Sequence, residues 1–197
     1  MAPRLSRVEY VYDDFGNRTE VLAFSDEGVS GDRLRINYYT APNLTTYIVD
    51  RIARVDAVNA ADRTTVLSRT DYFHDGNSGN QFAAPSRGLV TGRVDRLGGA
   101  SQLDPFWQYQ YDIYGNLTYE WDPLQHLTQT TYDSVFHTFP TSVQNALGHT
   151  ITSQYEPVGC ETPMPAGAGL VQRLIDSNNQ ATVKCYDFLG RPTEEIL

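Results

Sequence analysis

Lysine is almost absent from this sequence, and cationic residues as a group are outnumbered. Only one of the 15 Lys and Arg residues is a lysine, Lys184, while Asp and Glu number 24, so the net charge at pH 7 is -9. Phosphate backbones and anionic lipids repel such a chain, which excludes nonspecific binding to nucleic acid or to anionic membranes. Arginine lies flat on aromatic rings and pairs with carboxylates better than lysine does, and 13 tyrosines are present. The composition therefore predicts arginine and tyrosine side chains interleaved on sheet surfaces.

Long apolar runs and cysteines are also scarce. No run reaches the roughly 18 apolar residues of a transmembrane helix, and the N-terminus has Arg4 and Arg7 but no apolar signal-peptide core. Cys160 and Cys185 are too few for a disulfide scaffold and lack metal-ligand spacing. We interpret them as free or incidental thiols rather than catalytic ones, with their redox state left open. With 197 residues, 40% hydrophobic and 20% charged, the chain is long enough for one or two folded domains.

Helical periodicity is nearly absent, and an internal repeat takes its place. Tyr111–Thr118 recurs as Tyr12–Thr19 and as Tyr186–Thr193, each time with a glycine four residues after the tyrosine. An Asp that can hydrogen-bond the backbone, followed by a Gly free to adopt positive φ, is typical of a hairpin with a type I turn and a bulge. A second element, Asp122–Asp133, aligns without gaps on Asn145–Glu156. Each unit is therefore interpreted as strand, turn, strand.

The repeat predicts an all-β, mostly antiparallel fold of strand-turn-strand units. Segments rich in Thr, Val and Tyr, such as Leu127–Tyr132 and Ala181–Tyr186, fit a pleated surface. We assign scaffold roles to the tyrosines that end these strands, the glycines that set the turns, and the Asp that begins the second element. These residues are Tyr12, Gly16, Tyr111, Gly115, Asp122, Tyr132, Tyr155, Tyr186 and Gly190.

The two halves of the chain differ in regularity. Residues 1–100 are interpreted as degenerate repeats, and residues 101–197 as regular repeats with a Pro/Gly-rich surface loop inserted at 157–169. In the first half, residues 75–86 are expected to be the least ordered. Four longer strands are predicted there, at Leu34–Tyr39, Thr46–Asp56, Thr64–Phe73 and Gly88–Asp95.

These motifs together resemble a known family. The order Tyr-Asp-x-x-Gly-Asn-Leu-Thr, Trp-Asp-Pro-Leu and Thr-x-Thr-Thr-Tyr-Asp across residues 111–133 is similar to the YD, or Rhs, repeat of large bacterial toxins and wall-associated proteins. The segments 41–49, 72–77, 132–143 and 145–148 resemble more particularly the repeat region of the B component of insecticidal toxin complexes and of related virulence-plasmid proteins.

The resemblance implies a curved, spiralling β-sheet that winds into a hollow shell around a toxin polypeptide. It implies as partners the remainder of a larger toxin chain or another toxin-complex subunit, together with the enclosed polypeptide, and a secreted or cell-surface location. Nothing in the chain matches the C-terminal toxin, the plug with its aspartyl self-cleavage site, or the propeller of such proteins. We therefore expect a fragment of a larger product, with no cofactor, no metal and no catalytic activity of its own.

The chemical alternatives are weaker than the scaffold interpretation. The histidines, His74, His126, His137 and His149, lack the spacing that presents two imidazoles to one zinc ion. Aspartate pairs could serve a glycosidase, but each Asp has adequate work in a turn. The oxygen-rich segment 71–80 fails the EF-hand pattern because no closing carboxylate follows it.

A row of aromatic residues provides the alternative function. Trp107, Tyr109, Tyr119 and Trp121 alternate along two strands that flank Gly115, so we expect ladders on one face of a hairpin. Packing between strands is the simpler role. An exposed ladder would instead be a platform for glycans, which would make the chain a surface carbohydrate-binding or adhesive module.

Overall fold

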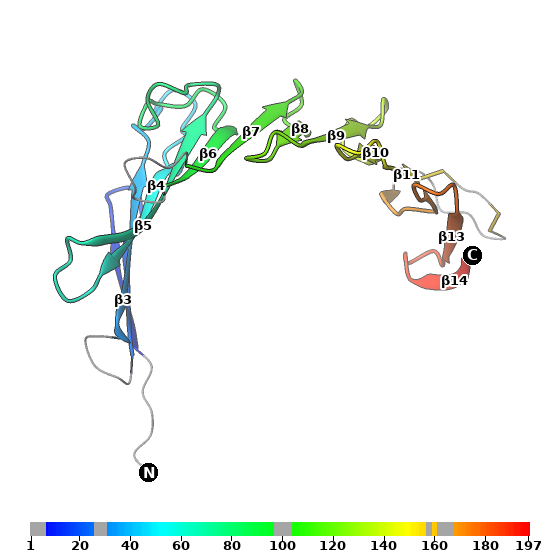
Figure 1. The fold of residues 1–197 in the computed structure, drawn as a ribbon. Helices are drawn as coiled ribbons and strands as arrows, with labels where there is room; N and C mark the ends of the chain where they lie inside the picture. The colour runs from blue at the N-terminus through cyan, green and yellow to red at the C-terminus, as the bar shows by residue number, and fades with distance from the viewer. Residues whose placement is uncertain (1–6, 26–30, 97–103, 157–158, 161–167) are drawn as a thin grey trace, which may run out of the picture. The chain divides into compact units, whose positions relative to one another are not determined.

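The computed structural model describes residues 7–25, 31–96, 104–156, 159–160 and 168–197. Within these ranges the regular structure is antiparallel β-sheet with no α-helix. The strands lie side by side in sequence order (Figure 1). The all-β antiparallel prediction is confirmed. The strands are β1 (Arg7–Tyr12), β2 (Arg18–Phe24), β3 (Arg33–Tyr39), β4 (Ile52–Asn59), β5 (Val66–His74), β6 (Val90–Arg96), β7 (Phe106–Tyr111), β8 (Leu117–Trp121), β9 (Leu127–Tyr132), β10 (Pro140–Gln144), β11 (Thr150–Gln154), β12 (Arg173–Ile175), β13 (Ala181–Tyr186) and β14 (Pro192–Ile196).

The sheet divides into two compact units, Met1–Gln108 (unit 1) and Tyr109–Leu197 (unit 2). In unit 1, the apolar core is small and consists of side chains such as Leu34, Ala53 and Val58, which are at most 3% exposed. In the described part of unit 2, the buried residues are Tyr155, Gln172 and Cys185. Since so few side chains are buried, cross-strand hydrogen bonds and local turn contacts must supply much of the order in both units.

One predicted strand is wrong over part of its length. Residues 46–51 do not belong to a long strand, because β4 begins only at Ile52. The side chain of Asn43 accepts hydrogen bonds from the N–H groups of Thr45 and Thr46 and closes a tight turn, which the Asn43–Ile48 bridge completes. A local side-chain acceptor has thus outcompeted the β-propensity of the threonines.

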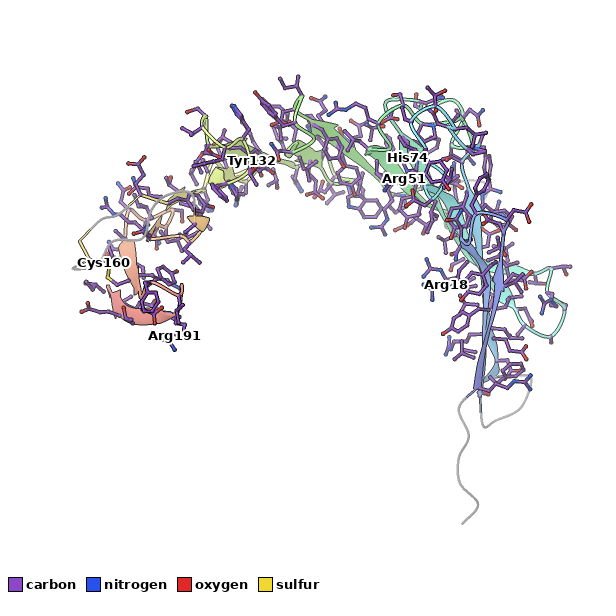
Figure 2. The ribbon with its side chains drawn as sticks, turned by 180° about the vertical axis from the view of Figure 1, so that it is seen from behind. Arg18, Arg51, His74, Tyr132, Cys160 and Arg191 are labelled. Carbon is purple, nitrogen blue, oxygen red and sulfur yellow. A yellow bond between two sulfur atoms is a disulfide. The ribbon has the colours of Figure 1, made fainter. Side chains whose placement is uncertain are left out.

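The two cysteines form a disulfide, which corrects the expectation of incidental thiols. The Cys160–Cys185 bond spans 25 positions in sequence, and Cys185 lies in β13 with 6% of its surface exposed (Figure 2). Most of the loop predicted at 157–169 lies outside the described residues. The bond fastens Cys160, which belongs to that loop, to β13.

The described residues include no helix with the length and hydropathy that a membrane crossing requires.

Candidate functional site

Six tight turns share one hydrogen-bond pattern. In each, Oδ1 of an Asp or Asn side chain accepts from the backbone N–H groups two and four residues later, at 2.8–3.0 Å. The backbone carbonyl of the same residue accepts from the N–H three residues later, where φ is positive, between 63° and 92°. The acceptor residues are Asp13, Asp112, Asp122, Asn145, Asp176 and Asp187. The predicted turn glycines Gly16, Gly115 and Gly190 occupy the positive-φ position.

In four of these turns, those of Asp13, Asp112, Asp122 and Asp187, the pKa of the aspartate lies below its usual value. The N–H of His126 is the largest of the influences that hold the pKa of Asp122 below its usual value, and the guanidinium of Arg191 is the largest for Asp187. Because hydrogen bonds to the ionised form favour it, these side chains act as anionic turn braces at neutral pH. The interpretation of the aspartates as turn formers agrees with this geometry.

The asparagine of the repeat motif links one turn to another, a role that the sequence did not reveal. Asn116 Nδ2 donates to its own turn's aspartate at 2.8 Å and to the carbonyl of His137, in the loop after β9, at 2.7 Å. Asn17 makes the equivalent pair of bonds, the second to the carbonyl of Val49 at 2.8 Å. The turn between β1 and β2 is therefore tied to the loop after β3, and the turn between β7 and β8 is tied to the loop after β9.

The repeat tyrosines fasten neighbouring strands. Each of three hydroxyl groups donates to a backbone carbonyl 15 residues earlier, at 2.9–3.0 Å. The three pairs are Tyr132 with Leu117, Tyr155 with Pro140, and Tyr186 with Val171. A recurrence at one fixed separation indicates a structural device of the repeat rather than a chance contact.

The other two scaffold tyrosines are placed differently. Tyr12 ends the edge strand β1 and is 55% exposed. Tyr111 is half-buried, and burial raises its pKa, with the Glu120 carboxylate adding to the shift.

A glycine in one of these turns should resist substitution. Gly148 has φ of 80°, and a Cβ atom there would meet nothing within 4 Å, so Gly148→Val isolates backbone strain from steric overlap. We expect the free energy of unfolding to fall by about 2 kcal/mol, because a β-branched residue is strained in this conformation. Urea denaturation measures the loss. The control is Gly79→Val, where φ is not positive and a Cβ also has open space; equal losses in both variants would refute the strain argument.

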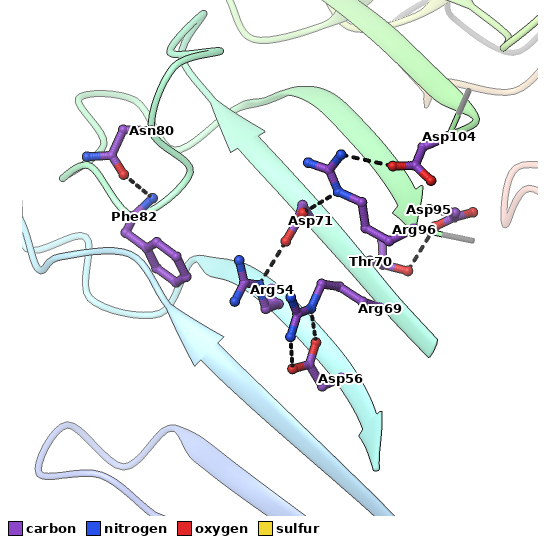
Figure 3. A network of polar contacts seen from close by, with 10 residues as sticks. All are labelled: Arg54, Asp56, Arg69, Thr70, Asp71, Asn80, Phe82, Asp95, Arg96 and Asp104. Carbon is purple, nitrogen blue, oxygen red and sulfur yellow. Dashed lines mark hydrogen bonds and ion pairs between the residues drawn. The ribbon is translucent and has the colours of Figure 1, made fainter. Parts of the chain in front are cut away.

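A network of arginines and carboxylates crosses three strands of unit 1 (Figure 3). Asp71, on β5, is 2% exposed and accepts from Arg54 Nε at 2.9 Å and from Arg96 Nε at 2.8 Å. Asp56, on β4, is 1% exposed and accepts hydrogen bonds from Arg69 Nε at 2.8 Å and from Arg69 Nη2 at 2.9 Å. The buried carboxylates are thus paired, as burial of charge requires.

Arginines also lie on aromatic rings, as the composition predicted. The guanidinium of Arg18 lies 5.5 Å from the ring centre of Tyr10, and that of Arg54 lies 5.8 Å from the ring centre of Tyr38. Arg54 also lies 5.2 Å from the ring centre of Phe82, and Arg93 lies 4.4 Å from that of Trp107. These contacts hold cations above sheet and loop aromatics in unit 1.

The four histidines take different positions. Three have scaffold contacts: Nδ1 of His126 lies 2.9 Å from its turn aspartate, the ring of His137 stacks on Tyr114 at 4.0 Å, and the N–H of His149 donates to Asn145. His74 alone is buried, near Arg51 (Figure 2), and its Nδ1 has no hydrogen-bond partner among the described residues. Burial lowers the pKa of His74.

The segment that suggested a calcium site is a hydrogen-bonded loop. Asp75 Oδ2 accepts from the N–H groups of Ser86, Arg87 and Gly88 at 2.7–3.0 Å, and Oδ1 accepts from that of Leu89 at 3.0 Å. These bonds use both carboxylate oxygens. The lower order expected of residues 75–86 stays a prediction. Within the described ranges, no group of three His, Cys, Asp or Glu side chains is arranged to hold a metal ion.

The predicted aromatic platform is partly visible in contacts. Tyr119 and Trp121 stack on β8 with ring centres 5.7 Å apart, whereas Trp107 lies under the guanidinium of Arg93. The glycan-platform role remains a prediction.

Comparison with known proteins yields structural likeness only. No protein-family model and no curated protein matches the chain. The chain is similar to the crystal structure of TcdB2-TccC3 over 96% of its own length and 9% of that chain, with 12% identity and a TM-score of 0.46. It is also similar to the crystal structure of TcdB2-TccC3-Cdc42 (11% identity, TM-score 0.25, 97% of this chain and 14% of that chain). A third match is a Photorhabdus luminescens Tc holotoxin pore (11% identity, TM-score 0.24, 97% of this chain and 13% of that chain). At these scores the likenesses carry no argument about function.

Proposed function

We propose that the chain is a noncatalytic wall segment of a shell, built by a larger toxin polypeptide, that encloses and helps deliver a toxic polypeptide. The observation that carries this proposal is the repeated hairpin, in which an Asx turn and a tyrosine hydroxyl contact recur at fixed positions. The repeat motif's resemblance to the YD family supplies the toxin context.

The proposed mechanism is geometric. Each strand pairs with its neighbours in sequence, so the sheet lengthens by the addition of further hairpins and needs no contact between distant repeats. Sheets twist with a fixed hand, and a strip that accumulates this twist can coil around an interior. Longer strips with the same turns would enclose more space, while continuous pairing would cover all edges but the first and last.

The Cys160–Cys185 disulfide supports a secreted or cell-surface location for the assembled shell. Disulfides persist in oxidising compartments and are rare in the cytosol. The proposed partners are the remainder of the toxin chain or another subunit of its complex, and the polypeptide inside.

The native size of the product tests the proposal. Immunoblotting and peptide mapping in the producing cell should find these residues in a polypeptide several times larger than 22.1 kDa. Limited proteolysis of that product should spare an enclosed segment until the shell is denatured. A stable product near 22.1 kDa with no enclosed polypeptide would overturn the shell, and glycan binding by such a product, lost in Trp121→Ala, would favour the adhesive module.

A further inference from the structure

An open aromatic groove lies in unit 2, between the loop that follows β9 and the end of β11. Its volume is about 560 Å³, and its lining includes Phe136, Phe139 and Tyr155. The rings form a continuous cluster: the Phe136 and Phe139 centres are 5.5 Å apart, and those of Phe139 and Tyr155 are 5.0 Å apart. The tyrosine hydroxyl is engaged with Pro140, so the ring is held in place as one wall.

The groove exposes apolar surface at its loop side. Phe136 is 50% exposed and Val135 is 74% exposed, although both lie in a loop whose backbone is fixed. Asp133 fixes it by accepting from four N–H groups, those of Val135, Phe136, Thr138 and Phe139. Together with the neighbouring rings of the groove, these exposed side chains form an apolar patch of the kind that marks a contact surface.

Two acidic residues, Asp133 and Glu156, line the groove. Glu156 lines it, is exposed, and has no ion-pair or hydrogen-bond partner among the described residues. At Asp133, burial favours the neutral acid, but the four N–H groups outweigh it and hold the pKa well below its usual range, so the Asp133 side chain is an anion at neutral pH. Unit 2 as a whole contains ten Asp and Glu residues against three Lys and Arg, a net charge of -7.

We propose that this groove binds an extended polypeptide segment in which a Lys or Arg adjoins a bulky apolar residue. The apolar side chain fills the space over Phe136 and Phe139, where it leaves water. The cationic side chain lays its aliphatic stem along the rings and directs its charge toward Glu156. The enclosed polypeptide of the proposed function would supply such a segment, and the identity of the occupant rests on that function.

Fluorescence anisotropy of a short labelled peptide of alternating lysine, leucine and serine tests the groove on the whole chain. We expect Phe136→Ala to weaken binding about tenfold, because it removes the exposed aromatic anchor. Glu156→Gln should weaken binding about threefold at low salt and have little effect at high salt, where its charge is screened. The control is Leu124→Ala, which truncates a 76% exposed apolar side chain outside the groove and should bind as the unmodified chain does.

Two comparison peptides decide the chemistry. Replacing lysine by glutamate, or leucine by serine, should abolish binding; equal binding of either peptide, or wild-type affinity in Phe136→Ala, would overturn the proposal. Each variant must have the far-UV circular dichroism spectrum and the urea midpoint of the unmodified chain. If Phe136→Ala unfolds, Glu156→Gln still tests the groove, because Glu156 is exposed. Peptide binding together with a native product near 22.1 kDa would support the groove and overturn the shell. A larger native product without peptide binding would support the shell and overturn the groove.

Discussion

Replacing Asp71 by asparagine should lower the free energy of unfolding of unit 1 by about 2 to 3 kcal/mol. The substitution keeps the shape of the side chain but removes the buried charge that faces both Arg54 and Arg96. The two guanidinium groups then face a neutral amide at position 71, where the native aspartate is 2% exposed. The arginine side chains themselves are 22% and 43% exposed, and their remaining contact with water keeps the loss below that of a fully buried pair.

Urea denaturation followed by tryptophan fluorescence measures this loss. Each unit contains one tryptophan, Trp107 in unit 1 and Trp121 in unit 2, so a Trp121→Phe background reports on unit 1 alone. The control is Asp50→Asn, which removes an exposed carboxylate that lies 3.3 Å from Arg51 and should cost at most about 0.5 kcal/mol. Equal shifts in both variants would mean that the buried network adds nothing to stability.

The same network also fixes strand register. In the observed pairing, Arg54 lies directly opposite Asp71, and Asp56 lies opposite Arg69. A slip of β5 by two residues along β4 would keep every side chain on its own face of the sheet. In one direction it would place Arg54 opposite Arg69, and in the other it would place Asp56 opposite Asp71. Like charges directly opposite one another are destabilising, so the Arg-x-Asp pattern penalises the slips that hydrophobic alternation allows.

The sequence sufficed for features that depend on neighbours along the chain. Leu127–Tyr132 and Ala181–Tyr186 have the predicted bounds, and Gly115 has the positive φ that its turn requires. β-propensity and turn chemistry act over a few residues, so a repeated pattern makes them visible.

Contacts between distant residues were not visible in the same way. The bond from Asn116 to the carbonyl of His137 spans 21 positions, and the tyrosine contacts span 15, so both depend on which strands pair and in which register. The Arg-x-Asp segments at 54–56 and 69–71 were a usable signal for the buried network, since reversed copies of one pattern on antiparallel neighbours are complementary. The disulfide required the distance between two cysteines, which spacing alone does not give.

Reduction of the Cys160–Cys185 bond should lower the free energy of unfolding of unit 2 by about 3.5 kcal/mol in the chain-entropy model, because it releases a loop of 25 residues in the unfolded chain. The effect is large relative to the rest of unit 2, where few described side chains are buried. The loop includes β12, which has only three residues and pairs with β11 and β13 through three residues on each side. A strand this short adds little pairing of its own, so the covalent link carries much of the order of this part of the sheet.

A Trp107→Phe background, in which Trp121 reports on unit 2, allows the measurement. The urea midpoint of the oxidised chain should fall when a thiol reductant is added. A Cys160→Ala, Cys185→Ala double variant should start near the reduced value and not respond to reductant, which separates loss of the bond from any other effect of the reagent. A midpoint that is unchanged by reductant would mean that hairpin pairing alone holds β12 in the sheet. A fall in the midpoint would mean that unit 2 depends on an oxidising environment for its stability. A shell wall that acts outside the cell would meet that condition.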